Sequence, residues 1–266
     1  MKKYNILSQE VFSKLKFPVP YFYGIANSNQ QLYSIGTRHS YDPNDPQFVF
    51  IQKKWKEFLD KTGNNRVVIV ESSIRPNFTN LEQAVRNSSE GGFISHLAQL
   101  SGVEVQCAEP VKDYEILELE KSFSKNEIVY YHFARSVSQY IRKHSSETEL
   151  GMRKFENYVK PFLIKYMKEF KWADFDFSLE NMYKIHKEVF GVEFDLTDKN
   201  FLIKIPWPVF YESVINQVSR ESGRIRDNWI VGKIETLWKQ GNSLFIVQGS
   251  SHAVIQERAI RQFTFD

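Results

Sequence analysis

The sequence predicts an α/β fold, in which a central, largely parallel or mixed sheet is flanked by helices and a mainly helical insertion occupies the middle of the chain. Near both ends, short apolar or β-branched runs alternate with amphipathic helical segments. This alternation is typical of βαβ units, because parallel neighbouring strands need a crossover connection. From about residue 114 to 190 the pattern is instead mostly helical.

The size and composition suit a single globular domain with a sizeable core. The chain has 266 residues, of which 42% are hydrophobic and 25% charged. No strong linker separates the middle from its flanks. We therefore expect one α/β domain over residues 1–266, with residues 111–207 as a mainly helical insertion or cap. The high aromatic content, 15%, predicts bulky core packing.

Three strands are expected in the first half of the chain, and a polar residue follows each of them. His39 lies in the loop after the first strand, Glu71 ends the second and Glu109 ends the third. Turn and N-cap residues at 42–46 precede the first helix. The expected strands are Leu32–Gly36, Arg66–Val70 and Val103–Ala108, and the expected helices run from about 47 to 61 and up to Leu100.

The remaining segments are mainly helical until a last strand, helix unit at the end of the chain. His252 follows that strand, and the N-terminus of the helix after it could assist an anionic ligand. The expected helices are Ile128–Lys143, Leu150–Phe170, Leu179–Phe190, Pro208–Ser219, Arg224–Lys239 and Ala253–Arg261, and the expected strand is Leu244–Val247.

Two copies of one pattern, Gly-x-x-His, place a histidine after the first and the last expected strand. They are Gly36-Thr37-Arg38-His39 and Gly249-Ser250-Ser251-His252. The 12 Gly and 6 His of the chain predict only about 0.3 such patterns by chance. Because ligands of open α/β sheets bind outside the carboxyl ends of the strands, we expect the two histidines to share one site.

The residue types expected at this site suit a divalent metal such as Mn, Co or Zn. His39, Glu71, Glu109 and His252 are the candidate ligands, and an open position would leave room for water. Each of these residues also has a simpler interpretation, because single histidines are usually structural and a glutamate after a strand is commonly solvated. Their joint placement favours the functional interpretation.

Arg226 is the candidate cation of the site, and it also has two interpretations. It can be part of a solvated first helical turn in which Asp227 suits the helix dipole. Alternatively, it can clamp a substrate carboxylate or a developing oxyanion. His96 and His132 lie in apolar helical patterns and are expected to be packing or surface residues. Ser250 and Ser251 lack the G-x-S-x-G spacing of a serine hydrolase nucleophile.

Charge, cysteine content and the N-terminal segment exclude several classes of protein. The formal net charge of +3 is too small to indicate a nucleic-acid partner. The single cysteine, Cys107, allows no internal disulfide and is expected to be a small core residue. The charged start lacks the apolar core of a signal peptide, and no window approaches 18 uncharged apolar residues. We expect a cytoplasmic protein without a membrane span.

The sequence resembles the superfamily that joins TraB/PrgY, Tiki proteases, ChaN-like haem-binding proteins and erythromycin esterases. The resemblance rests on both Gly-x-x-His patterns, on Val68-Ile69-Val70-Glu71 and on Arg226-Asp227. It implies an α/β core with a helical insertion, and it implies His39, Glu71, Arg226 and His252 as active-site residues, with Glu109 as a further carboxylate. The segment after Glu71, residues 72–75, departs from the TraB-like acidic pattern. Unlike in Tiki proteins, we expect neither a secretion signal nor a membrane anchor.

The leading hypothesis is a hydrolase, metal-assisted, that acts on an ester or amide bond of a small molecule or peptide. A metal-independent version, in which Glu71 and His39 activate water, stays open. The alternative is a non-enzymatic protein that binds haem or another small ligand in the same cleft. A third hypothesis is an interaction protein with an inactive cleft.

Overall fold

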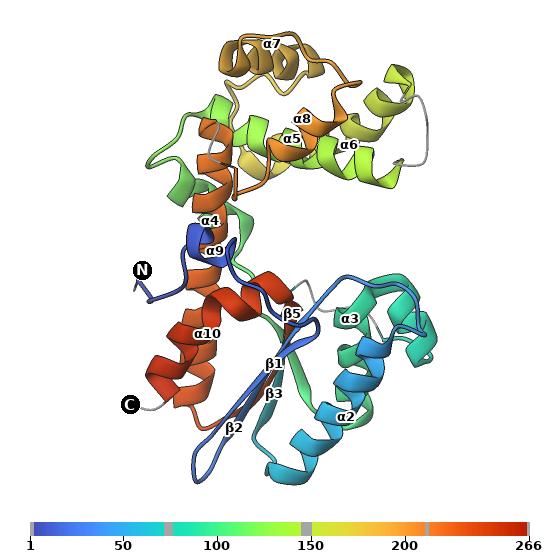
Figure 1. Ribbon diagram of the computed structural model, residues 1–266, viewed down its shortest axis with the longest axis vertical. Coiled ribbons are helices and arrows are strands. Elements are labelled where there is room, and N and C mark those ends of the chain that lie inside the picture. Colours follow the sequence, from blue (N-terminus) through green and yellow to red (C-terminus); the bar gives the residue numbers. More distant parts are fainter. Residues whose placement is uncertain (1–2, 72–76, 145–150, 211–212, 265–266) are drawn as a thin grey trace. The chain divides into compact units, whose positions relative to one another are not determined.

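The chain forms two compact units in the computed structural model, which describes residues 3–71, 77–144, 151–210 and 213–264 (Figure 1). One unit consists of residues 1–110 and 226–266, and the other of residues 111–225. The expected insertion, residues 111–207, falls within the second unit, which continues to Ile225.

The first unit contains a five-stranded mixed sheet, which confirms the predicted α/β class. The two Gly-x-x-His segments leave neighbouring parallel strands at the same end, because Thr37 is paired with Gly249. Val70, which precedes Glu71, is paired with Val247, so Glu71 lies at the same end of the sheet. Four strands are parallel, and the edge strand β1, which was not predicted, is antiparallel to β2. The order across the sheet is β1 (Tyr21–Ala26), β2 (Gln31–Thr37), β5 (Ser243–Gly249), β3 (Arg66–Val70), β4 (Glu104–Cys107).

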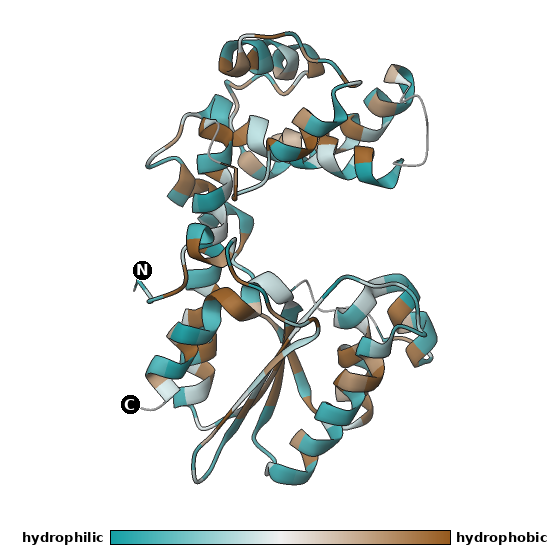
Figure 2. Cartoon of the chain, viewed as in Figure 1, coloured by the Kyte–Doolittle hydropathy of each residue, from teal (hydrophilic) through white to brown (hydrophobic). Residues whose placement is uncertain are grey.

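Helices cover both faces of this sheet, so its central strands are buried on both sides. In β5, Leu244 and Ile246 pack in the core with α9 and α10, whereas Phe245 and Val247 pack in the core with α2 and α3. Hydrophilic residues cover much of the visible surface of α2 (Figure 2). The helices are α1 (Gln9–Phe12), α2 (Pro46–Lys61), α3 (Leu81–Leu100), the later part of α9 (Val214–Lys239) and α10 (Ser250–Thr264).

The second unit is built from helices around an aromatic core. Its largest fully buried side chains are Tyr130, Phe133, Tyr140 and Phe155. Helix α5 begins with a capping box, in which Ser124 and Glu127 each bond the backbone of the other. The helices are α4 (Lys112–Leu119), α5 (Lys125–Lys143), α6 (Met152–Phe170), α7 (Leu179–Phe190), α8 (Lys199–Lys204) and the first part of α9.

One prediction for the helices was wrong. The segments 208–219 and 224–239 were expected as separate helices, but a single helix, α9, runs from Val214 to Lys239. Gly223 between them does not break it, because glycine costs a helix only about 1 kcal/mol relative to alanine. Buried apolar residues on both sides, such as Val218 and Ile230, outweigh that cost.

Within the described ranges, none of the helices combines the length and the apolar character that crossing a bilayer requires.

Candidate functional site

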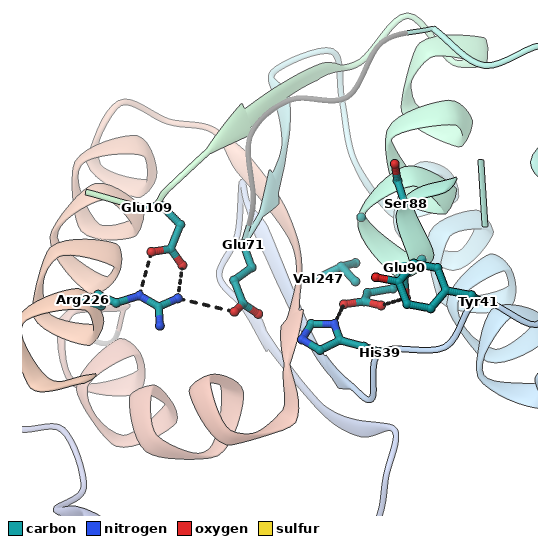
Figure 3. Close-up of a pocket in the computed structure, with 10 residues that line it drawn as sticks. His39, Tyr41, Glu71, Ser88, Glu90, Glu109, Arg226 and Val247 are labelled. Atoms are coloured by element: carbon teal, nitrogen blue, oxygen red, sulfur yellow. Dashed lines mark hydrogen bonds and ion pairs between the residues drawn. The ribbon is translucent and has the colours of Figure 1, made fainter. Parts of the chain in front are cut away.

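A cavity of about 400 Å³ lies at the carboxyl ends of the parallel strands of the first unit. Four of the predicted site residues line it, and Figure 3 shows Glu71 between the Arg226–Glu109 pair and His39. His252 is not in the lining, but its Nε2 lies 3.6 Å from Oε1 of Glu71. Most lining residues are ionisable or carry a hydroxyl, and Gly91 and Val247 are the exceptions. The full lining consists of His39, Tyr41, Glu71, Ser88, Ser89, Glu90, Gly91, Glu109, Arg226 and Val247.

His39 lies in the loop after β2 and is held by a carboxylate that the sequence did not reveal. Its Nδ1 is 2.7 Å from Oε1 of Glu90, on α3. The His39 side chain is 65% exposed, whereas that of Glu90 is only 6% exposed. The hydrogen bond to Glu90 raises the pKa of His39, although partial burial acts against this. With Nδ1 engaged, Nε2 lies on the opposite side of the ring and can exchange a proton with a bound molecule.

His252, in the first turn of α10, is held in the same manner but in a buried setting. Its Nδ1 is 2.6 Å from Oδ1 of Asp227, and this oxygen also accepts a hydrogen bond from Gln256 at 2.7 Å. Asp227 is only 1% exposed. Burial by itself would lower the pKa of His252, but the negative charge and hydrogen bond of Asp227 outweigh it, so that pKa is raised.

Glu71 connects the elements of the site. Its Oε2 accepts the backbone N–H of Gly249 at 2.6 Å, and its Oε1 lies 3.5 Å from Nη2 of Arg226. Burial would raise the pKa of Glu71, but the charges of His252 and Arg226 and the Gly249 amide together lower it. The carboxylate is therefore kept ionised, and it binds the amide of Gly249, which directly precedes α10.

The glycines of the two Gly-x-x-His patterns are needed for close packing, each in a different way. A Cβ on Gly36 would lie 2.8 Å from both Ala253 Cβ and Ser250 Cα, so this glycine lets the first turn of α10 lie against β2. A Cβ on Gly249 would lie 3.1 Å from Oε2 of Glu71. A side chain at position 249 would therefore press on Glu71 at its contact with the strand end.

Arg226 and Glu109 form a two-pronged ion pair on the far side of Glu71. Arg226 Nε donates to one oxygen of Glu109 at 2.9 Å and Nη2 donates to the other at 2.6 Å. Parallel bonds of this kind fix the plane of the guanidinium. Of the two interpretations of Arg226 and Asp227, the solvated first helical turn is wrong, because α9 begins at Val214 and Asp227 is buried against His252.

Two functional side chains, Glu90 and Asp227, were not predicted as partners of the histidines. Asp227 was noted in the Arg226-Asp227 motif and as favourable to the helix dipole, and Glu90 was not singled out. The run Ser88-Ser89-Glu90-Gly91-Gly92 carries the available signal for Glu90, since two adjacent glycines in a helical pattern suggest a break or a close approach. In the structure α3 is kinked there, with non-helical dihedral angles at Ser88 and Ser89.

Other side chains considered from the sequence lie where packing explains them. His96 and His132 are buried, with exposures of 7% and 3%. Cys107 is half-buried at the end of β4, and burial raises the pKa of its thiol. A thiol with a raised pKa is a poor nucleophile at neutral pH. Ser250 and Ser251 begin α10.

The arrangement of donors does not fit a divalent metal as it stands. Both oxygens of Glu109 accept from Arg226, and one oxygen of Glu71 accepts from Gly249. A cation at these carboxylates would compete with the guanidinium. Among residues 3–71, 77–144, 151–210 and 213–264, no three His, Cys, Asp or Glu side chains are grouped so as to hold a metal ion. A haem-like ligand would also meet the charged side chains of Glu71, Glu90, Glu109 and Arg226, whereas such ligands suit mainly apolar walls.

No family model, curated protein or solved structure matches the chain in comparisons with known proteins.

Proposed function

We propose that the chain is a hydrolase that cleaves an ester or amide bond with water activated by His39, without a resident metal. The observation that carries the proposal is the His39–Glu90 pair, whose Nδ1 to Oε1 distance is 2.7 Å, on a cavity that also contains the ionised Glu71. A histidine oriented by a carboxylate is the usual general base of hydrolytic sites.

In this proposal His39 Nε2 takes a proton from water as the water attacks the carbonyl carbon. The C–O or C–N bond of the substrate then breaks, and the His39 imidazolium gives the proton to the leaving alcohol or amine. Glu90 accepts the N–H of Nδ1, which fixes the tautomer and stabilises the imidazolium that forms. Glu71 adds negative charge near the same ring, since the two groups interact electrostatically. The base is thus stabilised in the protonated form that it has after proton transfer.

Arg226 is the proposed stabiliser of negative charge on the attacked carbonyl oxygen. It lines the cavity, and its pairing with Glu109 orients it in advance, so no reorganisation is needed during the reaction. His252 acts on the site from behind the lining. Held by Asp227, it keeps Glu71 ionised and in place, because its Nε2 lies 3.6 Å from that carboxylate.

The charge of the cavity favours neutral or cationic substrates over anionic ones. Its lining contributes Glu71, Glu90 and Glu109, against the guanidinium of Arg226 and the imidazole of His39. An anionic group close to the scissile bond would be repelled by this excess of carboxylates. Small esters and amides or short peptides without an acidic side chain beside that bond are the proposed substrates.

A cytoplasmic place of action belongs to the same proposal. The single cysteine rules out an internal disulfide in this chain, as is usual for proteins of reducing compartments.

A panel of ester and amide substrates in matched neutral, cationic and anionic forms tests the proposal. We expect hydrolysis by the unaltered chain, with neutral and cationic substrates preferred, and its loss in His39→Ala and Glu71→Gln. An enzyme that prefers the anionic forms would contradict the proposed role of the carboxylates. A chain inactive on the whole panel would contradict the hydrolase.

Chelation separates the proposed route from the metal-assisted one. We expect hydrolysis to be unchanged after treatment with a strong chelator, and unchanged again after Mn, Co or Zn is added back. Activity that disappears with the chelator and returns with one metal would instead show that this metal takes part in the reaction.

A further inference from the structure

Ser89 has a backbone conformation that serine rarely adopts, in the middle of a helix beside the cavity. Its dihedral angles are φ 52° and ψ −143°, and it interrupts α3. This region of conformational space is costly for a residue with a side chain and is essentially confined to glycine. Ser89 is nevertheless a serine, and it is buried, with an exposure of 4%.

The corner in α3 is tight, and a neighbouring glycine makes it possible. A Cβ on Gly92 would lie 2.4 Å from the carbonyl oxygen of Ala84, so the two halves of the helix approach one another closely there. Gly92 thus explains how the corner forms. It does not explain why the strained position carries a hydroxyl.

The hydroxyl of Ser89 joins the two parts of the His39–Glu90 pair. Its oxygen accepts the backbone N–H of Ser40 at 2.9 Å and lies 2.8 Å from the carbonyl oxygen of the same residue. It also contacts Oε2 of Glu90. Ser40 directly follows His39, and the other oxygen of Glu90 holds His39. One buried hydroxyl therefore connects the loop of the histidine with the carboxylate that orients it.

We propose that Ser89 is a positioning residue of the site: its strained backbone in α3 directs its hydroxyl to Ser40 and Glu90, and so fixes the His39–Glu90 pair. The inference rests on the proposed function for its catalytic consequence, but the arrangement of His39 can be tested without any activity. Strain at a position that contacts a functional group is a common way to hold a site in advance of binding.

Two substitutions separate the hydroxyl from the strain. Ser89→Ala removes the hydroxyl and keeps the strained backbone, whereas Ser89→Gly removes the hydroxyl and relieves the strain. Ser101→Ala is the matched control, because the Ser101 hydroxyl bonds a carbonyl of the same helix, Leu97 O, at its far end. Since glycine tolerates the conformation of Ser89, Ser89→Gly keeps the test available if Ser89→Ala does not fold.

The first measurement is an NMR titration of the His39 imidazole, assigned by the loss of its signal in His39→Ala. Because Glu90 loses its clamp, we expect both Ser89 variants to lower the pKa of His39 toward its ordinary value, and Ser101→Ala to leave it unchanged. Thermal unfolding should place the midpoint of Ser89→Gly at or above that of Ser89→Ala. An unchanged His39 titration in both Ser89 variants would overturn the inference.

The second measurement is hydrolysis as a function of pH. We expect kcat/KM to fall about 10²-fold in both variants, the loss typical of a catalytic group displaced by about 1 Å, and the acid limb of the profile to move to lower pH with the pKa of His39. If the imidazole titration shifts but the unaltered chain hydrolyses nothing on the panel, the positioning role stands and the proposed hydrolase fails. If the chain is active and neither variant changes its rate or pH profile, the positioning role fails.

Discussion

The two Gly-x-x-His segments have the same pattern and leave neighbouring parallel strands, yet they put their histidines to different uses. His39 follows β2 in a loop, with a side chain that is 65% exposed on the cavity. His252 lies in the first turn of α10, with a side chain that is 13% exposed behind Glu71. Each has its Nδ1 on a carboxylate. In the proposed mechanism the exposed histidine meets the substrate, and the buried one holds Glu71.

Their carboxylate partners lie on helices of different regularity. Asp227 projects from a continuous helix, α9, and is 1% exposed. Glu90 projects from a kink in α3, where the strained Ser89 connects it to the loop of His39. Both carboxylates are buried, so the two pairs differ mainly in the exposure of the histidine. The His39–Glu90 and His252–Asp227 pairs should therefore respond differently to substitution.

The largest expected effect is the loss of activity when the exposed histidine, His39, is removed. We expect His39→Ala to lower kcat/KM by about 10²–10⁴-fold, the usual contribution of a general base. Because the side chain is mostly exposed, the free energy of unfolding should change by less than about 0.5 kcal/mol. Kinetics on the best substrate of the panel and urea unfolding measure the two quantities. His144→Ala is the control for loss of an imidazole, and full activity in His39→Ala would remove the proposed base.

The next largest effect is the loss of stability when the buried His252–Asp227 pair is broken. Asp227→Ala leaves His252 and Gln256 without the oxygen that both of them contact. Removing one partner of a buried pair of this kind costs about 3 kcal/mol. Glu90→Ala, whose partner is exposed, should cost clearly less. Urea unfolding of both variants at pH 7 measures the difference, and equal costs would mean that burial does not distinguish the two pairs.

Much of this fold could be predicted from the sequence, because its signals are local. The β-branched run Arg66–Val70 and the strand before Gly249 lie close to their expected bounds. The edge strand β1 was not predicted: it is antiparallel, its burial alternates only in part, and Gly24 lies within it. An edge strand lacks the continuous apolar run that burial on both faces imposes on the central strands.

The site could be predicted only where its residues follow strands. His39, Glu71 and Glu109 each come directly after an expected strand, and parallel strands bring such residues to one edge. Glu90 could not be found in this way, because its contact with His39 depends on the corner at Ser89, and helical periodicity carries no sign of that corner. Asp227 was misplaced because the start of α9 was expected ten residues too late, at Arg224 in place of Val214.

Substitution of the glycines of the two Gly-x-x-His patterns should have a smaller effect on stability and activity, and this effect separates the roles of the two glycines. Gly36→Ala places a Cβ 2.8 Å from Ala253 and Ser250, and overpacking of this kind costs about 1–3 kcal/mol. Gly249→Ala meets the side chain of Glu71 at 3.1 Å, so it should cost less stability and more activity. Gly63→Ala is the control, because a Cβ there has no neighbour within 4 Å. If Gly249→Ala costs more stability than Gly36→Ala, the two roles are reversed.

The smallest effect is the dependence of stability on pH, and it compares the two pairs directly. The folded pKa values of His39 and His252 lie above their ordinary value of 6.5, and that of Glu71 lies below 4.5. The histidine contributions are therefore complete below pH 6.5 and are lost as the pH rises through the folded pKa values. The Glu71 contribution is complete above pH 4.5 and is lost as the pH falls. These groups together favour the folded state most between the two values.

Urea unfolding at about pH 5.5 and about pH 8.5 isolates the histidine contributions. We expect His252→Gln to flatten the decrease in the free energy of unfolding between these pH values more than His39→Gln does. The reason is solvent screening, which limits an ion pair with an exposed partner to less than about 1 kcal/mol, whereas the His252–Asp227 pair is shielded. A decrease that survives in His252→Gln but disappears in His39→Gln would show that the exposed pair provides the pH-dependent stability, contrary to the division of roles between the two Gly-x-x-His segments.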